Sequence, residues 1–150
     1  RDRAWREVQG AEMDGRMKRT PIKSRSISPR SRLIAIAESA VNAFVRARDA
    51  GRPCISCFEH KPLTAGHYRS TRAAPELRFD AKNIHGQCSR CNIDLAGNRE
   101  GYREGLIERF GYLFLAWLDG PHEAKHYTRD ELERIRVEYS KKLAELKGAA

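Results

Sequence analysis

The sequence has no long apolar segment. Its longest uninterrupted apolar run is the seven residues from Tyr112 to Leu118, whereas a membrane-spanning helix needs about 18 or more. It also has no internal repeat, no glycine-rich phosphate loop and no GxSxG motif. These absences give no support to a membrane protein, a P-loop nucleotide-binding protein or an α/β-hydrolase. His122-Glu-Ala-Lys-His126 has the spacing of an HExxH motif, but we interpret this segment as a turn before the last helix and expect no catalytic part for either histidine.

Cysteine is scarce, and its placement is informative. The four cysteines form two pairs, Cys54-Ile-Ser-Cys57 and Cys88-Ser-Arg-Cys91, separated by residues 58–87. Two such CxxC pairs can present four thiolates to one tetrahedral Zn²⁺ ion. No secretory signal precedes the pattern, so we predict structural zinc. Two disulfides or inert buried thiols are the alternative.

Acidic residues are missing from one part of a chain that is basic overall. The net charge is +9 over 150 residues, a length typical of one domain. Residues 17–32 hold six Lys and Arg and no Asp or Glu, and residues 51–97 are net +3. This distribution favours a polyanion, and we predict DNA rather than a membrane surface. For the arm, residues 1–30, a disordered and merely solubilising tail is the alternative.

Three polar residues stand at informative positions relative to the cysteines. His67 ends a predicted strand, and Asn83 lies five residues before the third cysteine. Asn92 directly follows the fourth cysteine. This order of His, Asn and Asn resembles the pattern of HNH endonucleases.

These three residues match what phosphodiester hydrolysis requires, namely a base to activate water and a divalent cation to neutralise developing charge. We predict His67 as the base, with its other ring nitrogen bonded to a backbone carbonyl of the loop that Asn83 positions. Asn92 would give a neutral oxygen ligand to Mg²⁺ or Mn²⁺. A closed Cys₄ zinc has no open coordination position, so its role would be structural.

The position before the predicted base is unusual. HNH enzymes often have an Asp there to hold the catalytic cation, whereas this chain has Gly66. The second protein ligand is therefore open. We take His85 as the first candidate, because it should project from the second strand on the same face as Asn83. His60, Asp80 and Asp94 are the other candidates.

Hydrophobic periodicity and turn residues predict the remaining elements. Helical spacing of apolar residues predicts a helix from Ser28-Pro29 to Gly51, which packs behind the zinc unit. We expect short strands at 65–69 and 83–87, a short helix from about Cys91, and further helices after Asn98, which we take as a helix cap. Thr128-Arg-Asp-Glu131 predicts the capping box of a final helix. We expect Trp117 to lie in the core.

The predicted fold class is α+β, with a small ββα-metal unit of HNH, treble-clef-like type embedded in a mainly helical domain. We place this unit at about 53–98, inside a single domain covering 31–150. The helical scaffold would cover 31–50 and 99–147, and residues 1–30 would form the basic N-terminal arm.

Several further segments are similar to the phage lambda NinG (Rap) recombination family over roughly residues 33–147. They are Ala40-Val-Asn-Ala-Phe, Pro53-Cys-Ile-Ser-Cys, Ala65-Gly-His-Tyr-Arg, Ala73-Ala-Pro-Glu-Leu-Arg-Phe, Asn83-Ile-His, Gln87-Cys, Cys91-Asn, Gly97-Asn and Tyr102-Arg. Members of that family are structure-specific endonucleases that cut Holliday junctions and D-loops, and the resemblance implies this activity here. The extra N-terminal cysteine cluster of lambda-type members is missing, which leaves only the basic arm in that part.

The expected partner is DNA, in branched form. Basic and aromatic residues near the predicted site and in the arm should contact its phosphates: Tyr68, Arg69, Arg72, Arg78, Lys82, Lys18 and Arg19. A homodimer and recombination proteins of phage or host are further partners left open. We expect a phage- or prophage-encoded protein of the bacterial cytoplasm. A non-catalytic zinc-binding DNA module and an HNH nuclease of other specificity are the alternative functions.

Overall fold

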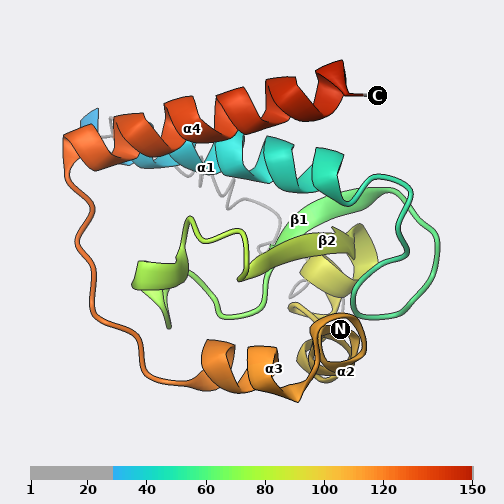
Figure 1. Cartoon of the computed structure of the whole chain (residues 1–150). Helices are drawn as coiled ribbons and strands as arrows, with labels where there is room; N and C mark the ends of the chain where they lie inside the picture. The colour runs from blue at the N-terminus through green and yellow to red at the C-terminus, as the bar shows by residue number, and fades with distance from the viewer. Residues whose placement is uncertain (1–28, 150) are drawn as a thin grey trace, which may run out of the picture.

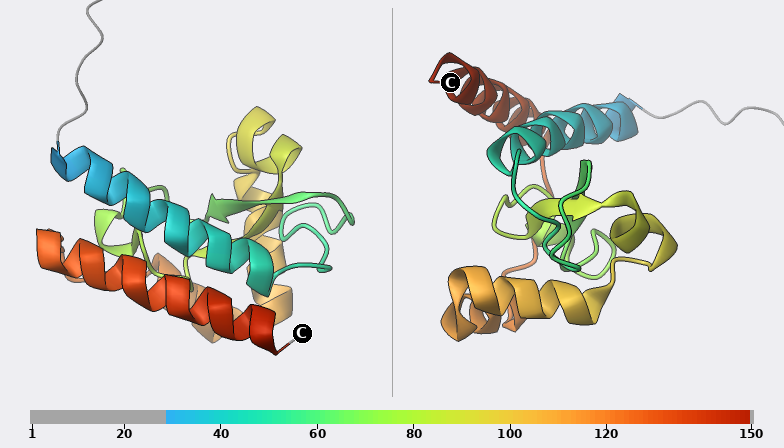
Figure 2. Two further views of the ribbon diagram at one scale, coloured as in Figure 1. Left: turned by 90° about the horizontal axis from the view of Figure 1, so that it is seen from above. Right: turned by 90° about the vertical axis from the view of Figure 1, so that its right-hand side faces the viewer.

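The computed structural model describes residues 29–149, and its helices enclose a small antiparallel hairpin (Figures 1 and 2). Two long helices, α1 and α4, lie side by side on one face of the hairpin, and α2 and α3 lie on the other. The elements are α1 (Pro29–Arg48), β1 (Leu63–His67), η1 (Pro75–Leu77), β2 (Ile84–Cys88), η2 (Arg90–Asp94), α2 (Arg99–Phe110), α3 (Tyr112–Asp119) and α4 (Arg129–Gly148).

The first helix forms as predicted but ends three residues early. Its apolar positions Ala37, Val41 and Val45 are buried against the hairpin and α4. After the helix, Asp49 turns inward and accepts a hydrogen bond of 2.7 Å from the backbone N–H of Gly86. This contact with β2 ends the helix before Gly51, whose φ of +77° suits a glycine. The predicted cap Ser28 lies outside the described residues.

The hairpin pairs β1 with β2, with Leu63 opposite Cys88 and His67 opposite Ile84. Both strands were predicted, but β1 starts and ends two residues earlier and β2 one residue later. Beyond His67 one more backbone hydrogen bond follows, from the N–H of Tyr68 to the carbonyl of Asn83 at 2.9 Å. The side chain of Asn83 then takes over, accepting a 2.8 Å hydrogen bond from the N–H of Arg69. All five residues of β2 are buried.

The second and third helices pack on the cysteine-bearing loop. Leu106 on α2 and Leu115 and Leu118 on α3 share a core with Ile55 of that loop. The predicted cap, Asn98, precedes α2 but makes no capping hydrogen bond. Its amide instead donates to the carbonyl of Ser56 at 3.4 Å and to Cys91 Sγ at 3.5 Å. Asn98 is therefore the N-cap residue of α2 as predicted, but its side chain does not cap the helix because the cysteine loop competes for it.

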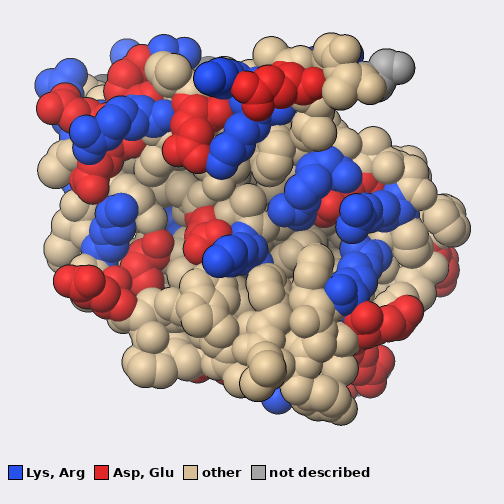
Figure 3. All heavy atoms as spheres, viewed as in Figure 1, with Lys and Arg blue, Asp and Glu red and all other residues tan. Residues whose placement is uncertain are grey.

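The α2–α3 side also leaves apolar side chains at the surface. Trp117, predicted to lie in the core, is 41% exposed, and Phe110 is 42% exposed. Tyr112 and Leu113 are exposed beside them. In Figure 3 the lower part of the molecule, where α2 and α3 lie in Figure 1, carries few charged side chains. The prediction for Trp117 failed because α3 is short and buries only one stripe of its surface.

The last helix begins as predicted. Thr128 Oγ1 accepts a hydrogen bond from the N–H of Glu131, and the Glu131 carboxylate accepts one from the N–H of Thr128. Leu132 and Tyr139 are buried against α1 and the hairpin. Within residues 29–149, no helix has the length and apolarity needed to cross a membrane.

Candidate metal centre and neighbouring site

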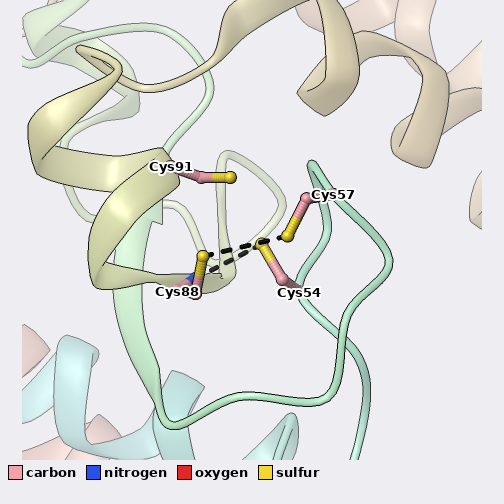
Figure 4. A group of neighbouring side chains, drawn as sticks. All are labelled: Cys54, Cys57, Cys88 and Cys91. Carbon is pink, nitrogen blue, oxygen red and sulfur yellow. Dashed lines mark hydrogen bonds between the residues drawn. The ribbon is translucent and has the colours of Figure 1, made fainter.

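The four cysteines converge although they come from two distant segments (Figure 4). Cys54 and Cys57 belong to the loop after α1, Cys88 ends β2, and Cys91 lies in η2. Their sulfur atoms all lie within 4.8 Å of one another, and those of Cys57 and Cys88 are 3.9 Å apart. A tetrahedral zinc with bonds of about 2.3 Å needs sulfurs about 3.8 Å apart. The cluster could therefore bind a metal such as zinc.

The surroundings of Cys54 favour its thiolate, whereas burial raises the pKa of the Cys57 and Cys91 thiols. The cysteines are free thiols, so the disulfide alternative has no support. Cys54 Sγ accepts hydrogen bonds from the backbone N–H groups of Ser56 at 3.4 Å and Cys88 at 3.3 Å. Burial opposes ionisation of Cys54, but these N–H groups outweigh it and lower its pKa to about 7. Donors aimed at sulfur are the usual second layer around a thiolate–metal centre.

His67, the predicted base, has the hydrogen bond expected of it. Its Nε2 lies 2.9 Å from the carbonyl oxygen of Arg78 in the loop between the strands. Because a carbonyl can only accept, Nε2 carries the proton and Nδ1 remains an acceptor. Burial is the main cause that lowers the pKa of His67, and the charge of Arg78 acts in the same direction. The imidazole is therefore neutral at neutral pH.

Asn83 holds the loop that supplies this carbonyl. Its side-chain amide donates to the carbonyls of Arg69 at 2.9 Å and Leu77 at 3.3 Å. Its oxygen accepts from the N–H of Arg69. Since Leu77 immediately precedes Arg78, a fully buried Asn83 fixes the position of the carbonyl that bonds His67.

Asn92 reaches the hairpin from η2. Its amide donates to Thr64 Oγ1 at 2.9 Å, and its Oδ1 lies 3.2 Å from where a β-carbon on Gly66 would stand. Gly66, which precedes His67, and Asn92, which follows the fourth cysteine, are thus neighbours in the structure.

His85 lies in a different environment from the one expected. It is 2% exposed, its Nδ1 is 3.1 Å from the hydroxyl of Tyr102, and its ring packs against Phe110 and Phe114. Burial is the first cause that lowers its pKa to about 3, with the charge of Arg48 next. It therefore sits under α2, away from open solvent.

The other candidates for the second ligand are not gathered near Asn92. His60 lines a separate surface hollow with Arg46 and Lys61. Asp80 accepts a 2.8 Å hydrogen bond from the N–H of Lys82, which caps a turn. Asp94 is exposed at the end of η2.

The predicted DNA-contacting residues fall into two groups. Arg69 bonds the carbonyls of Leu118 and Gly120 at 3.2 and 3.1 Å, and Arg78 pairs with Glu38 at 2.6 Å. Tyr68 is buried and donates its hydroxyl hydrogen to Asp119, so its ring would not stack on a base. These three side chains support the fold.

Arg72 and Lys82 form the second group, because both are exposed. Lys18 and Arg19 lie outside the described residues. Sequence reasoning missed Arg99, whose guanidinium carbon lies 5.5 Å from the centre of the Tyr68 ring. Arg99 lines a cleft of about 250 Å³ together with His67, Tyr68, Arg69, Ser70, Ala73, Ala96, Gly97 and Tyr102. The only signal for it was its place directly after the Gly97-Asn98 segment.

The cysteine cluster, the hairpin and η2 lie within a region matched by one family model. The model of the bacteriophage lambda NinG protein matches residues 3–148. The chain belongs to the NinG family. The NinG proteins of Salmonella phage P22 and Escherichia phage lambda are 44% and 42% identical to it over 130 residues. The family resemblance expected from the sequence is thereby confirmed.

The match to these NinG proteins is partial in length. The aligned part covers 85% of this chain but 64% of the P22 and lambda proteins, and 65% of the 42% identical protein of Escherichia phage 933W. The chain therefore spans slightly less than two thirds of its curated relatives. No solved structure matches it.

Proposed function

We propose that this NinG-family chain is a metal-dependent DNA endonuclease of the HNH type that hydrolyses phosphodiester bonds in branched recombination intermediates. The observation that carries the proposal is the hydrogen bond between His67 Nε2 and the Arg78 carbonyl. It leaves a neutral imidazole whose Nδ1 is an acceptor without a hydrogen bond to any residue of 29–149, at the end of a strand. Two strands, η2 and four cysteines around one point would then form a ββα-metal unit with structural zinc.

His67 would act as the general base. Its Nδ1 takes a proton from a water molecule, the water oxygen attacks phosphorus, and one P–O ester bond breaks as the leaving oxygen departs. The carbonyl of Arg78 accepts from Nε2 and stabilises the imidazolium formed in this step. Asn83 acts on the base only indirectly, by holding the loop that carries that carbonyl.

Asn92 would bind the catalytic cation through its amide oxygen. A bound Mg²⁺ or Mn²⁺ supplies positive charge that neutralises the phosphate and the leaving oxygen. The four cysteines would hold zinc for structure alone, since a closed tetrahedral site has no position for substrate.

Exposed basic side chains would hold the DNA backbone. Arg72, Lys82 and Arg99 are exposed, and Arg99 shares a cleft with His67. Such contacts position phosphates without reading bases, so affinity should depend on salt more than on sequence. The preference for branched DNA rests on the family resemblance.

The test is single-turnover cleavage of a labelled four-way junction, with linear and forked DNA alongside, across a titration of Mg²⁺ and Mn²⁺. Binding is measured separately in Ca²⁺. His67→Ala should still bind zinc and the junction but cleave about 10² to 10⁴ times more slowly, at every metal concentration. His60→Ala, which removes an exposed histidine from a different hollow, is the matched control and should cleave normally.

Asn92→Ala should also cleave slowly, but part of its loss should be recovered at high metal concentration, because it removes one ligand of a weakly held ion. Unchanged cleavage by His67→Ala would overturn the assignment of the base. Binding without cleavage of any DNA by the wild type would favour a zinc-binding DNA module. Equal cleavage of linear and branched DNA would point to an HNH nuclease of other specificity.

A further inference from the structure

Gln87 carries a buried oxygen without a partner. The residue is fully buried in β2, and its Oε1 forms no hydrogen bond within the described part of the chain. Its Nε2 donates to Ser56 Oγ at 2.7 Å and to the carbonyl of Gly97 at 2.6 Å. Because a carbonyl accepts only, the amide nitrogen must face Gly97. It is therefore the oxygen that is left unpaired, and buried acceptors of this kind normally have a partner.

That oxygen points at Gly66, the position where HNH enzymes often have an acidic ligand. A β-carbon built on Gly66 would lie 2.2 Å from Gln87 Oε1 and 3.2 Å from Asn92 Oδ1. Any side chain at position 66 would therefore collide with the Gln87 amide. The glycine is needed for space, and the oxygen of Gln87 reaches the place that the side chain of residue 66 would otherwise fill.

The orientation of Asn92 is fixed by a similar argument. The hydroxyl of Thr64 donates its hydrogen to the backbone carbonyl of Gln87 at 2.8 Å. It can then only accept from Asn92, so the amide nitrogen of Asn92 faces Thr64 at 2.9 Å. The Asn92 oxygen remains free of hydrogen bonds within residues 29–149, and it lies on the Gly66 side.

We propose that Gln87 Oε1 and Asn92 Oδ1 together form the protein part of a divalent cation site, with Gln87 as the second ligand. The role of this site rests on the proposed nuclease function. The test of cation binding does not, because it requires no cleavage. Amide oxygens are suitable ligands for Mg²⁺ and Mn²⁺, and such ions keep several waters. Asn92 is only half-buried, so η2 is the side from which a hydrated ion can enter.

Two neutral ligands bind a divalent ion weakly. We expect a dissociation constant of about 1 mM or weaker for Mn²⁺ alone, since affinity follows the number of charged ligands. Phosphate oxygens of DNA would complete the site. The ion would thus be held firmly only when DNA is bound.

The experiment measures Mn²⁺ binding to the zinc-loaded full chain by electron paramagnetic resonance, without DNA and without reference to cleavage. Asn92→Asp adds a charged ligand and should bind Mn²⁺ at least about tenfold more tightly. Ala116→Asp adds the same charge at an exposed position of α3 and should leave the affinity unchanged. In the Asn92→Asp background, Gln87→Met removes the second oxygen and should reverse most of the gain.

Zinc content and circular dichroism establish that each variant is folded. If Gln87→Met fails to fold, Gly66→Ala in the Asn92→Asp background gives the second measurement, because it displaces the Gln87 oxygen and should weaken Mn²⁺ binding. Equal affinity of Asn92→Asp and Ala116→Asp, or full affinity without the Gln87 oxygen, would overturn the site. If the wild type cleaves DNA but Gln87→Met does not change the Mn²⁺ affinity, the nuclease proposal stands and the cation site with Gln87 is refuted. Mn²⁺ binding that depends on both Asn92 and Gln87, without cleavage of any DNA, would support this site and refute the nuclease proposal.

Discussion

Replacing Gly105 with alanine tests how the cysteine loop is held on α2. A β-carbon at Gly105 would lie 1.9 Å from the carbonyl oxygen of Ile55 and 3.0 Å from its carbonyl carbon. Gly101, one turn earlier, makes the same close approach to the carbonyl of Ser56. A glycine in the middle of a helix is normally unfavourable. Here it allows backbone to pack directly on backbone.

The cost of Gly105→Ala follows from that distance. Carbon and oxygen normally approach to about 3.3 Å, so α2 and the loop must separate by more than about 1 Å. The obstacle is a backbone carbonyl between Cys54 and Cys57, which cannot rotate away. Overpacking costs about 1–3 kcal/mol, and alanine regains about 1 kcal/mol of helix propensity. Because Ile55 and Leu106 are both fully buried at this contact, we expect a net loss of about 2 kcal/mol.

Urea unfolding of the zinc-loaded chain measures this loss, and a melting temperature lower by about 4–8 °C should accompany it. The strained loop should also release zinc faster to a chelator. Gly148→Ala is the control, because a β-carbon there meets nothing within 4 Å, and it should change stability by less than about 0.5 kcal/mol. If Gly105→Ala were as stable as the wild type, the close packing of α2 on the loop would be refuted.

Three other predictions concern zinc, pH and DNA. Cys88→Ser should lose zinc and unfold, because it removes one of the four converging sulfurs and zinc binding is coupled to folding in such sites; a variant with one equivalent of zinc and an unchanged thermal transition would contradict the four-cysteine site. His85 has a pKa of about 3 in the folded chain and about 6.5 when unfolded. Only the unfolded state then gains a proton between these values, so stability should decrease as pH falls from about 6.5 toward about 3. Urea unfolding at pH 7 and pH 5 should give a smaller difference for His85→Leu, and an equal difference would refute the assignment. Arg72→Ala and Lys82→Ala should weaken junction binding and each reduce the salt slope by about 1. Arg69→Ala should instead lower stability, because its guanidinium bonds the end of α3. Unchanged slopes for Arg72 and Lys82 would identify them as ordinary surface charges.

Much of the site could be located from the sequence because its pattern is local. A CxxC spacing brings two sulfurs together within one turn, so both cysteine pairs were recognisable. The capping box from Thr128 to Glu131 and the buried stripe of α1 likewise depend on neighbours three or four residues apart. Asn83 and Asn92 were found by their distance from a cysteine, which is again a short interval.

Tertiary structure decided which atoms of those residues are free. The sequence marked Arg69 and Arg78 as basic, but carbonyls of α3 and the carboxylate of Glu38 engage them. It marked His85 as the candidate ligand, but α2 covers that side chain. Gln87, next to the third cysteine, instead directs at Gly66 an oxygen that has no partner among residues 29–149. These outcomes depend on contacts between segments 20 to 50 residues apart. Residue type and spacing determine which chemistry the chain carries, whereas the packing of helices on the hairpin determines which groups can use it.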